Sequence, residues 1–198
     1  MQLRTSPLSP FGRKVVVAAT CLGLGDQLEL TPADFRDAND PLRVENPLGK
    51  MPVLTLDDGS TLYDSPVIVE YLNSLGDHQL IPPTGASRWE ALRFQALADG
   101  LMDAGVAIQM EKNLRPVEKQ HPDWLDFQRG KLERGFAALA SNPPSVEPIT
   151  IGAISVACLL EWIDFRQQMD WRAAQPNLSE WLERFNGAVP FFAQTRPA

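Results

Sequence analysis

The sequence predicts two unlike halves, an α/β domain followed by an all-α domain. Strand and helix patterns alternate over residues 1 to about 75, whereas strand patterns largely disappear beyond residue 87. All 5 tryptophans lie in the second half, as is typical where helices pack large side chains against one another. We therefore expect an N-terminal domain over 1–77, a proline- and glycine-containing linker over 78–86, and a helical domain over 87–198.

The elements of the first half follow from hydrophobic spacing and turn residues. MQLRTS is a short strand, and residues 11–23 have the apolar spacing of a helix that the glycines of GLGDQ end. LELT is a second strand, which Pro32 assigns to a sheet edge because proline donates no ladder hydrogen bond. MPVLTL and STLY form a hairpin around DDG. The stretch DSPVIVEYLNSLG forms a helix, with Ser65 as its N-cap, Pro66 at its first position and Gly76 at its end.

The second half is expected to be helical throughout. The predicted helices cover residues 87–115, 122–141, 150–166 and 177–186.

Composition excludes several classes of function. The net charge of −7 argues against a nucleic-acid binder and against a polybasic membrane contact. The most apolar stretches, 15–24 and 154–163, are too short to span a bilayer, and the N-terminus lacks the apolar segment of a secretory signal. The two cysteines lack CxxC spacing, and His78 and His121 lie in polar stretches, which predicts no disulfide framework and no metal site. We expect a cytoplasmic protein.

Three short motifs carry the chemistry. TSPLSPFGRKV begins with two serine–proline pairs and allows either simple turn chemistry or a site for a small anionic group. In KMPVL, Pro52 stands where a strand should begin, and a cis bond before it would turn the Met51 N–H and C=O outward. In YDSPV, Ser65 lies at a helix start, where unpaired N–H groups and the helix dipole favour a carboxylate. The alternative is that Ser65 only caps its own helix.

Together these motifs resemble those of the glutathione transferase family. SPLSPFGRKV, NPLGKMPVL and YDSPVIVEYL follow the order and spacing of its thioredoxin-like N-terminal domain, and ITIGAISVACLLEW and QPNLSEWLERF resemble its all-helical C-terminal domain. LADGLMDA, residues 97–104, is similar to the fourth helix of bacterial members. The resemblance covers almost the whole chain. It implies a homodimer that uses glutathione as co-substrate and needs no metal.

The resemblance also implies a role for each residue of the glutathione site. Pro52 would follow a cis bond, and the Met51 backbone would pair with the cysteinyl part of glutathione. Ser65 would hold the γ-glutamyl carboxylate through its N–H and hydroxyl, and Asp64 would contact the amine. Lys50 would reach the glycyl carboxylate.

The resemblance places Ser9 where serine-type members keep the hydroxyl that faces the thiol, with Ser6 as the alternative. A free thiol has a pKa of ~8.5, and lowering it by about two units takes roughly 2.7 kcal/mol. One hydrogen bond to a charged acceptor supplies ~1.5–3 kcal/mol. The Ser9 hydroxyl, aided by the helix start near Phe11, is therefore sufficient for most of the activation. The first loop contains neither tyrosine nor cysteine, which argues against those two chemistries.

An electrophile site is expected between the two domains, near Ser9 and the fourth helix. At their helical spacing its candidate residues could equally be core; they are Phe11, Met102, Val106 and Met110. Asp99 and Asp103 are four residues apart on one helical face and are either solvated surface charge or, for Asp103, a group that reaches glutathione across a dimer. Arg13 and Lys14 are interpreted as helix-surface charges.

The implied activity is conjugation of the glutathione thiolate to small electrophilic molecules, a detoxification reaction. A glutathione-dependent isomerase, dehalogenase or reductase is the alternative enzyme, although reduction usually uses a cysteine in the first loop. A non-catalytic glutathione-binding module is the third possibility, because a fold does not by itself establish a function.

Overall fold

The computed structural model describes residues 1–76 and 79–197. Its first half contains four strands, which form one small sheet, and three α-helices. In chain order these are β1 (Gln2–Thr5), α1 (Pro10–Cys21), β2 (Glu29–Pro32), α2 (Leu42–Glu45), β3 (Val53–Thr55), β4 (Thr61–Leu62) and α3 (Ser65–Leu75).

The sheet has the strand order β2-β1-β3-β4. β2 runs parallel to β1, whereas β3 is antiparallel to both β1 and β4. β2 is therefore an edge strand, as Pro32 at its end predicts. The β3–β4 turn is also confirmed, and its Gly59 has a φ of 84°, a conformation that glycine adopts without steric cost.

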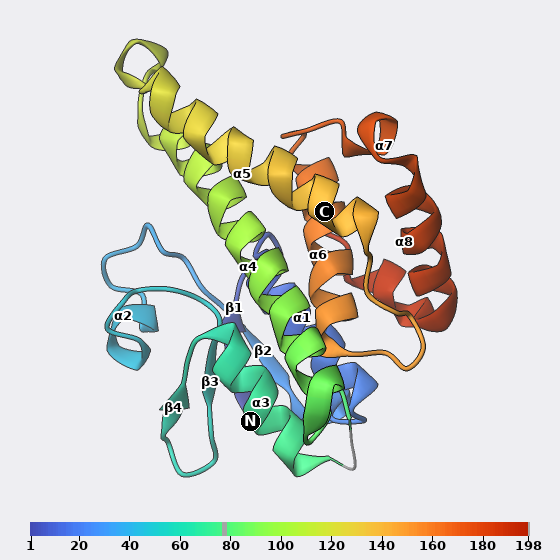
Figure 1. The fold of residues 1–198 in the computed structure, drawn as a ribbon. Helices are drawn as coiled ribbons and strands as arrows, with labels where there is room; N and C mark the ends of the chain where they lie inside the picture. Colours follow the sequence, from blue (N-terminus) through green and yellow to red (C-terminus); the bar gives the residue numbers. More distant parts are fainter. Residues whose placement is uncertain (77–78, 198) are drawn as a thin grey trace.

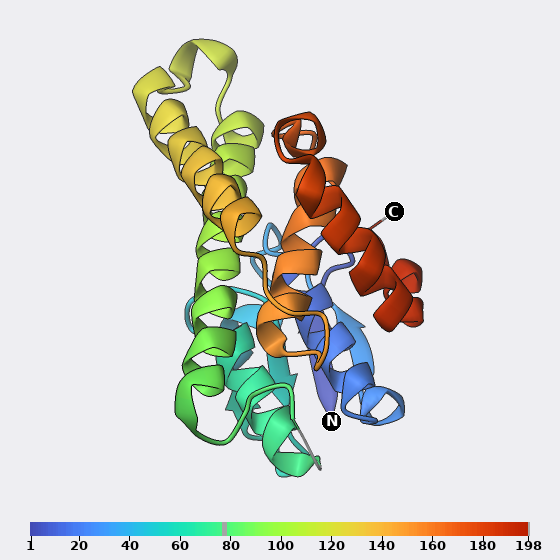
Figure 2. The ribbon, with the colours of Figure 1, turned by 45° about the vertical axis from the view of Figure 1, so that its right-hand side comes forward.

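The second half contains helices and no strand among its described residues. Its helices are α4 (Gly85–Leu114), α5 (Pro122–Ser141), α6 (Ile151–Phe165), α7 (Trp171–Ala174), α8 (Pro176–Ala188) and the 3₁₀ segments η2 (Val117–Lys119) and η3 (Pro190–Thr195). α4 and α5 form a long hairpin, and both views place α6 between α4 and α8 (Figures 1 and 2). Every residue of α6 from Ile151 to Ile163 is buried, so this helix is the centre of the core.

α1 joins the two halves of the molecule. It packs on α3 within the first half and on α6, α4 and η3 within the second. Because helices cover it on two sides, α1 buries polar as well as apolar side chains. The residues that begin α1 are therefore held at the boundary between the sheet and the helical domain.

Several local predictions need correction. Asp64, not Ser65, occupies the N-cap of α3, so Ser65 is the first helical residue and Pro66 the second. α4 begins at Gly85, inside the predicted linker, whose first residue, His78, lies outside the described part of the chain. The short helices α2 and α7 were not predicted, because one turn of helix produces no hydrophobic periodicity. His121 is exposed.

Candidate functional site

The register of the sheet gathers the three predicted motifs at one end. The two ladders of β3 pair Arg4 with Val53 and Leu62 with Leu54. Beyond Val53 the chain leads back to Pro52. If both registers are extended in that direction, Pro52 lies between the end of β1 and the start of α3. The loop that follows β1, the Met–Pro turn and the first turn of α3 therefore meet at the same edge.

The Met–Pro turn leaves a peptide unit free beside this edge. The Met51–Pro52 bond is cis, as the resemblance implies. The N–H and C=O of Met51 make no hydrogen bond to any residue in 1–76 or 79–197. Asn46, which is buried, holds the turn in place: its Nδ2 donates to the Lys50 carbonyl at 2.7 Å, and its Oδ1 accepts from the Leu48 N–H at 3.0 Å. The sequence analysis missed Asn46, for which the turn-rich NPLG stretch was the available signal.

The first turn of α3 also presents free donors. Ser65 is 2% exposed, and within the described residues neither its N–H nor its Oγ has a hydrogen-bond partner. The structure therefore does not support the alternative in which Ser65 caps its own helix. Asp64 precedes it at an exposed position and follows a cis bond from Tyr63. A hydroxyl and an N–H without partners at the positive end of a helix favour a carboxylate ligand.

Ser9 is the N-cap of α1. Its Oγ accepts a hydrogen bond from the Gly12 N–H at 3.2 Å, and its carbonyl accepts from the Arg13 N–H at 3.0 Å. A hydroxyl has one donor and two acceptor sites, so the Ser9 proton stays free to donate elsewhere. The cap thus fixes the oxygen without using its proton.

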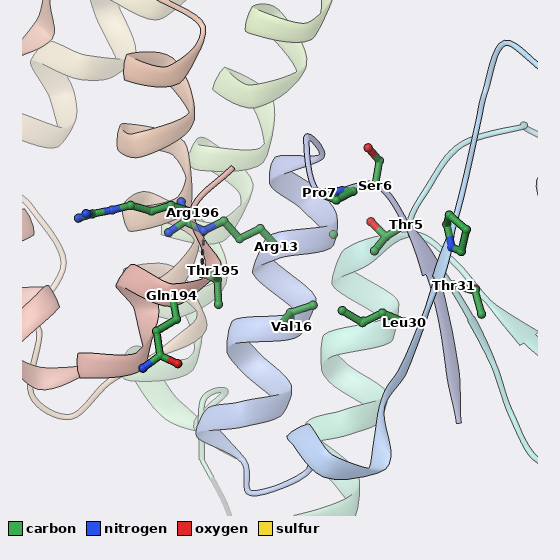
Figure 3. A pocket seen from close by; sticks show the side chains of 12 residues that line it. Thr5, Ser6, Pro7, Arg13, Val16, Leu30, Thr31, Gln194, Thr195 and Arg196 are labelled. Carbon is green, nitrogen blue, oxygen red and sulfur yellow. Dashed lines mark hydrogen bonds between the residues drawn. The ribbon is translucent and has the colours of Figure 1, made fainter. Parts of the chain in front are cut away.

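Ser6 lies in a different environment. Its Oγ accepts from the Leu8 N–H at 3.3 Å, and its carbonyl accepts from the Ser9 N–H at 2.9 Å. Ser6 also lines a pocket bordered by α1, β2 and the C-terminal segment (Figure 3). β2 and β3 flank β1 on opposite sides, so this pocket opens on the β2 side of β1, and the choice between Ser9 and Ser6 stays a prediction.

The predicted surface charges of α1 are in fact buried. Lys14 has no exposed surface, and its Nζ lies 2.7 Å from both Asp99 carboxylate oxygens. Burial lowers the pKa of Lys14, and burial raises the pKa of Asp99 while Lys14 opposes that change. Arg13 is also buried and pairs with Glu161 on α6 at 2.6 Å. The surface interpretation of Asp99 was therefore wrong as well, because α4 lies directly against this face of α1.

The charges of Lys50 and Asp64, two residues of the predicted site, act on the exposed carboxyl of Asp103. Burial raises the pKa of the Asp103 carboxyl, the positive charge of Lys50 lowers it, and the negative charge of Asp64 raises it. Asp64 also raises the pKa of Asp99 and that of the Lys14 ammonium. These couplings indicate that the middle of α4 faces the edge where the Met–Pro turn and α3 meet.

The four candidates for an electrophile site divide into two groups. Phe11, Val106 and Met110 are half-buried, so part of each side chain is open to a ligand. Met102 has no exposed surface and is part of the core. Its predicted contact with an electrophile is not supported, because the residue is enclosed by the packing of α4.

Trp162 on α6 is a residue that the sequence analysis missed. Its Nε1 donates to the Leu8 carbonyl at 3.1 Å, which ties the first loop to the helical domain immediately before Ser9. A Cβ at Gly105 would lie 2.5 Å from the Trp162 ring, so α4 packs directly against the indole. Trp162 was unremarkable in sequence, because one aromatic residue in an apolar helix is typical of core.

Over residues 1–76 and 79–197, no cluster of three or more His, Cys, Asp and Glu side chains has the arrangement needed to hold a metal ion. Within the same ranges, no helix combines the length and the apolar character needed to cross a membrane.

The fold defines the class of protein: a small mixed sheet with a cis-proline turn, joined through α1 to a helical domain. Comparison with known sequences specifies it further. Residues 8–75 match the glutathione S-transferase N-terminal domain, and residues 122–184 match the glutathione S-transferase C-terminal domain. The chain therefore belongs to the glutathione S-transferase family.

Full-length relatives support this assignment. The uncharacterized GST-like protein YibF of Escherichia coli strain K12 is 30% identical over 203 residues, covering 100% of this chain and 98% of that protein. A glutathione transferase family member from Pseudomonas fluorescens Pf-5, solved with bound glutathione, is 39% identical with a TM-score of 0.92, covering 100% and 98% of the two chains. A glutathione S-transferase from Methylobacillus flagellatus KT with bound glutathione is 33% identical with a TM-score of 0.89, covering 100% and 99%.

Proposed function

We propose that this protein is a glutathione transferase that conjugates the thiolate of bound glutathione to small electrophilic molecules. The observation that carries the proposal is the hydrogen bonding of Ser9, whose hydroxyl accepts from the Gly12 N–H and keeps its own proton free, on the loop between β1 and α1. Met51 and Ser65, on the two other motifs, likewise present unpaired groups among the described residues. Relatives crystallised with glutathione, at 39% and 33% identity over the full chain, support glutathione as the ligand of that edge.

Each part of the tripeptide has a matching group. The free N–H and C=O of Met51 pair with the backbone of the cysteinyl residue, as a strand would. Ser65 and the N-terminus of α3 hold the γ-glutamyl carboxylate, and Asp64 takes the amine. Lys50 is exposed beside them and takes the glycyl carboxylate. The zwitterionic γ-glutamyl end and the anionic glycyl end of glutathione differ in charge, and this difference fixes its direction in the site.

The thiol then lies towards the start of α1. The Ser9 hydroxyl donates to the sulfur, while the Gly12 N–H holds the serine oxygen from the other side. A charge-assisted hydrogen bond of ~1.5–3 kcal/mol corresponds to a thiol pKa lowered by about one to two units. The thiolate attacks the electrophile directly, so no general base is needed. The half-buried side chains of Phe11, Val106 and Met110 form the apolar wall for the electrophile.

We also propose that the protein acts as a homodimer in which Asp103 approaches glutathione bound to the partner subunit. Asp103 is exposed on α4, where a second copy of the chain can reach it. Asp103→Ala is expected to weaken glutathione binding, measured by calorimetry at protein concentrations above and below the dimer dissociation constant. An unchanged affinity would remove Asp103 from the site.

The decisive experiment measures the thiol pKa of bound glutathione from the ultraviolet absorbance of the thiolate. Wild-type protein should lower this pKa, and Ser9→Ala should raise it by about one to two units. Ser6→Ala is the matched control and should leave it unchanged. If Ser6→Ala alone has the effect, the two serines exchange roles. Glutathione that binds with an ordinary thiol pKa indicates a non-catalytic binding module instead.

A second variant tests the carboxylate site separately. Ser65→Ala should weaken glutathione affinity about tenfold while leaving the thiol pKa of the bound fraction low. An unchanged affinity would contradict the role of Ser65. Assays of isomerisation, dehalogenation and disulfide reduction with the same protein distinguish conjugation from the related reactions.

A further inference from the structure

Two consecutive residues of α6 hold the segment that contains Ser9. Trp162 Nε1 donates to the Leu8 carbonyl at 3.1 Å, directly before Ser9. Glu161 Oε2 accepts from Arg13 Nη2 at 2.6 Å, in the first turns of α1 after Ser9. Because α6 belongs to the helical domain and this segment follows β1 of the sheet domain, the helical domain holds the segment on both sides of Ser9.

The two contacts act on different kinds of backbone. Arg13 lies inside α1, and its N–H donates to the Ser9 carbonyl at 3.0 Å, so helical hydrogen bonds already order it. Leu8 lies in the turn before α1, and its N–H donates to the nearby Ser6 Oγ. Its carbonyl accepts from Trp162 and from no other group in residues 1–76 and 79–197. The indole is therefore the group that fixes this turn to the rest of the molecule.

Trp162 is itself held firmly. Its side chain is 3% exposed, and it lies in the fully buried part of α6. Gly105 of α4 packs directly against the indole, since a Cβ there would lie 2.5 Å from the ring. Gln168 Nε2 donates to the Gly105 carbonyl at 2.8 Å, which joins the segment after α6 to the same point of α4. The position of the indole N–H is therefore set by the packing of α4 on α6.

We propose that Trp162 is a positioning residue for Ser9: its hydrogen bond to the Leu8 carbonyl holds the Ser9 hydroxyl where it donates to the thiol of glutathione. The inference rests on the proposed function and deepens it. The Gly12 N–H fixes the Ser9 oxygen relative to α1, whereas the indole fixes the turn relative to the core of the helical domain. Because hydrogen bonds weaken steeply as their geometry is lost, a turn that moves by about 1 Å activates the thiol less.

The thiol pKa of glutathione bound to the full chain tests this role, measured from the ultraviolet absorbance of the thiolate. Trp162→Phe keeps an aromatic ring in α6 but removes the indole donor. It should raise the thiol pKa by about half a unit to one unit, a smaller change than Ser9→Ala produces. Trp124→Phe, at an exposed position of α5, is the matched control and should leave the thiol pKa unchanged.

A double-variant cycle distinguishes positioning from a general structural role. If Trp162 acts through the Ser9 hydroxyl, Trp162→Phe has no further effect once that hydroxyl is absent. The double variant Ser9→Ala/Trp162→Phe should therefore have the same thiol pKa as Ser9→Ala. Shifts that add in the double variant would show that Trp162 acts on the thiol by another route and would overturn the inference.

A second pair of variants retains the indole and keeps the inference testable if Trp162→Phe does not fold. Gly105→Ala places a Cβ against the Trp162 ring, so the indole must move and its N–H loses its alignment with the Leu8 carbonyl. This variant should also raise the thiol pKa. Gly100→Ala, whose Cβ meets nothing within 4 Å, should not. Circular dichroism checks that each variant is folded.

The failure of the inference differs from the failure of the proposed function. Wild-type protein that binds glutathione with an ordinary thiol pKa overturns both. Wild-type protein that lowers the thiol pKa, together with equal values within the Trp162→Phe and Trp124→Phe pair or within the Gly105→Ala and Gly100→Ala pair, overturns the role of Trp162 alone.

Discussion

The Lys14 ammonium lies 2.7 Å from both carboxylate oxygens of Asp99, and the lysine side chain has no exposed surface. The pair joins α1 of the sheet domain to α4 of the helical domain. The Nζ has no other hydrogen-bond partner among the described residues. The positive charge of Lys14 on α1 is therefore balanced by a carboxylate from the second half of the molecule, close to the predicted glutathione site.

Breaking this pair should be costly. Lys14→Met leaves the Asp99 carboxylate without its cation and should lower the free energy of unfolding by about 3 kcal/mol, because an unpaired charge is left largely buried. The double variant Lys14→Met/Asp99→Leu removes both charges and should lose less than Lys14→Met alone. Urea unfolding of the three proteins measures the difference. A double variant that is less stable than Lys14→Met would show that the pair stabilises the fold beyond mutual neutralisation.

The two roles of Ser9 can be separated. Ser9→Asp provides an equally good N-cap for α1, but its carboxylate has no proton to donate and repels a thiolate. We expect Ser9→Asp to keep the stability of the wild-type protein and to lose activation of the glutathione thiol. Ser9→Ala should lose the activation and also about 1 kcal/mol of stability. Thermal unfolding and the thiol pKa are measured side by side. A Ser9→Asp protein that still lowers the thiol pKa would exclude the hydroxyl as its cause.

Close packing of α4 on α6 requires a glycine. A Cβ at Gly152 would lie 2.7 Å from the Cβ of Phe94 and 2.8 Å from the Ala91 carbonyl oxygen. Because the carbonyl is backbone, it cannot move aside, and Gly152→Ala should destabilise the protein by about 1–3 kcal/mol. Gly100→Ala on α4 is the control: its Cβ meets nothing within 4 Å, so it should stabilise by ~0.5–1 kcal/mol. Denaturant unfolding should show shifts of opposite sign.

The Cys21 thiol makes the free energy of unfolding depend on pH in the alkaline range. Burial raises the pKa of Cys21 from its ordinary 9.0 to about 11. Because the folded state keeps this proton longer than the unfolded state, the contribution is fully present below pH 9 and is lost as pH rises through about 11. The contribution is of order 1–2 kcal/mol. Cys21→Ala should therefore lose stability less steeply over this interval, measured by urea unfolding at a series of pH values. Parallel curves for the two proteins would contradict the raised thiol pKa.

Local patterns in the sequence predicted most elements close to their observed bounds. The edge position of β2, the β3–β4 hairpin and the long helices α4, α5 and α6 follow from turn residues and hydrophobic spacing, because these depend on neighbours along the chain. Local patterns did not predict the one-turn helices α2 and α7 or the residue that caps α3. They are fixed by contacts that hydrophobic periodicity does not encode.

The sequence by itself determined the two-domain fold, the family and the residues proposed to hold glutathione, because short motifs in a fixed order carry that information. Only the tertiary structure decided that the charged side chains of α1 are buried and which carboxylates they pair with. Arg13 and Lys14 read as surface residues in a helical pattern, but α1 is covered on two sides, so each meets a carboxylate from a distant helix. The structure also revealed the contacts of Asn46 and Trp162. Burial and partner choice for a polar side chain depend on residues far along the chain, and no local pattern specifies them.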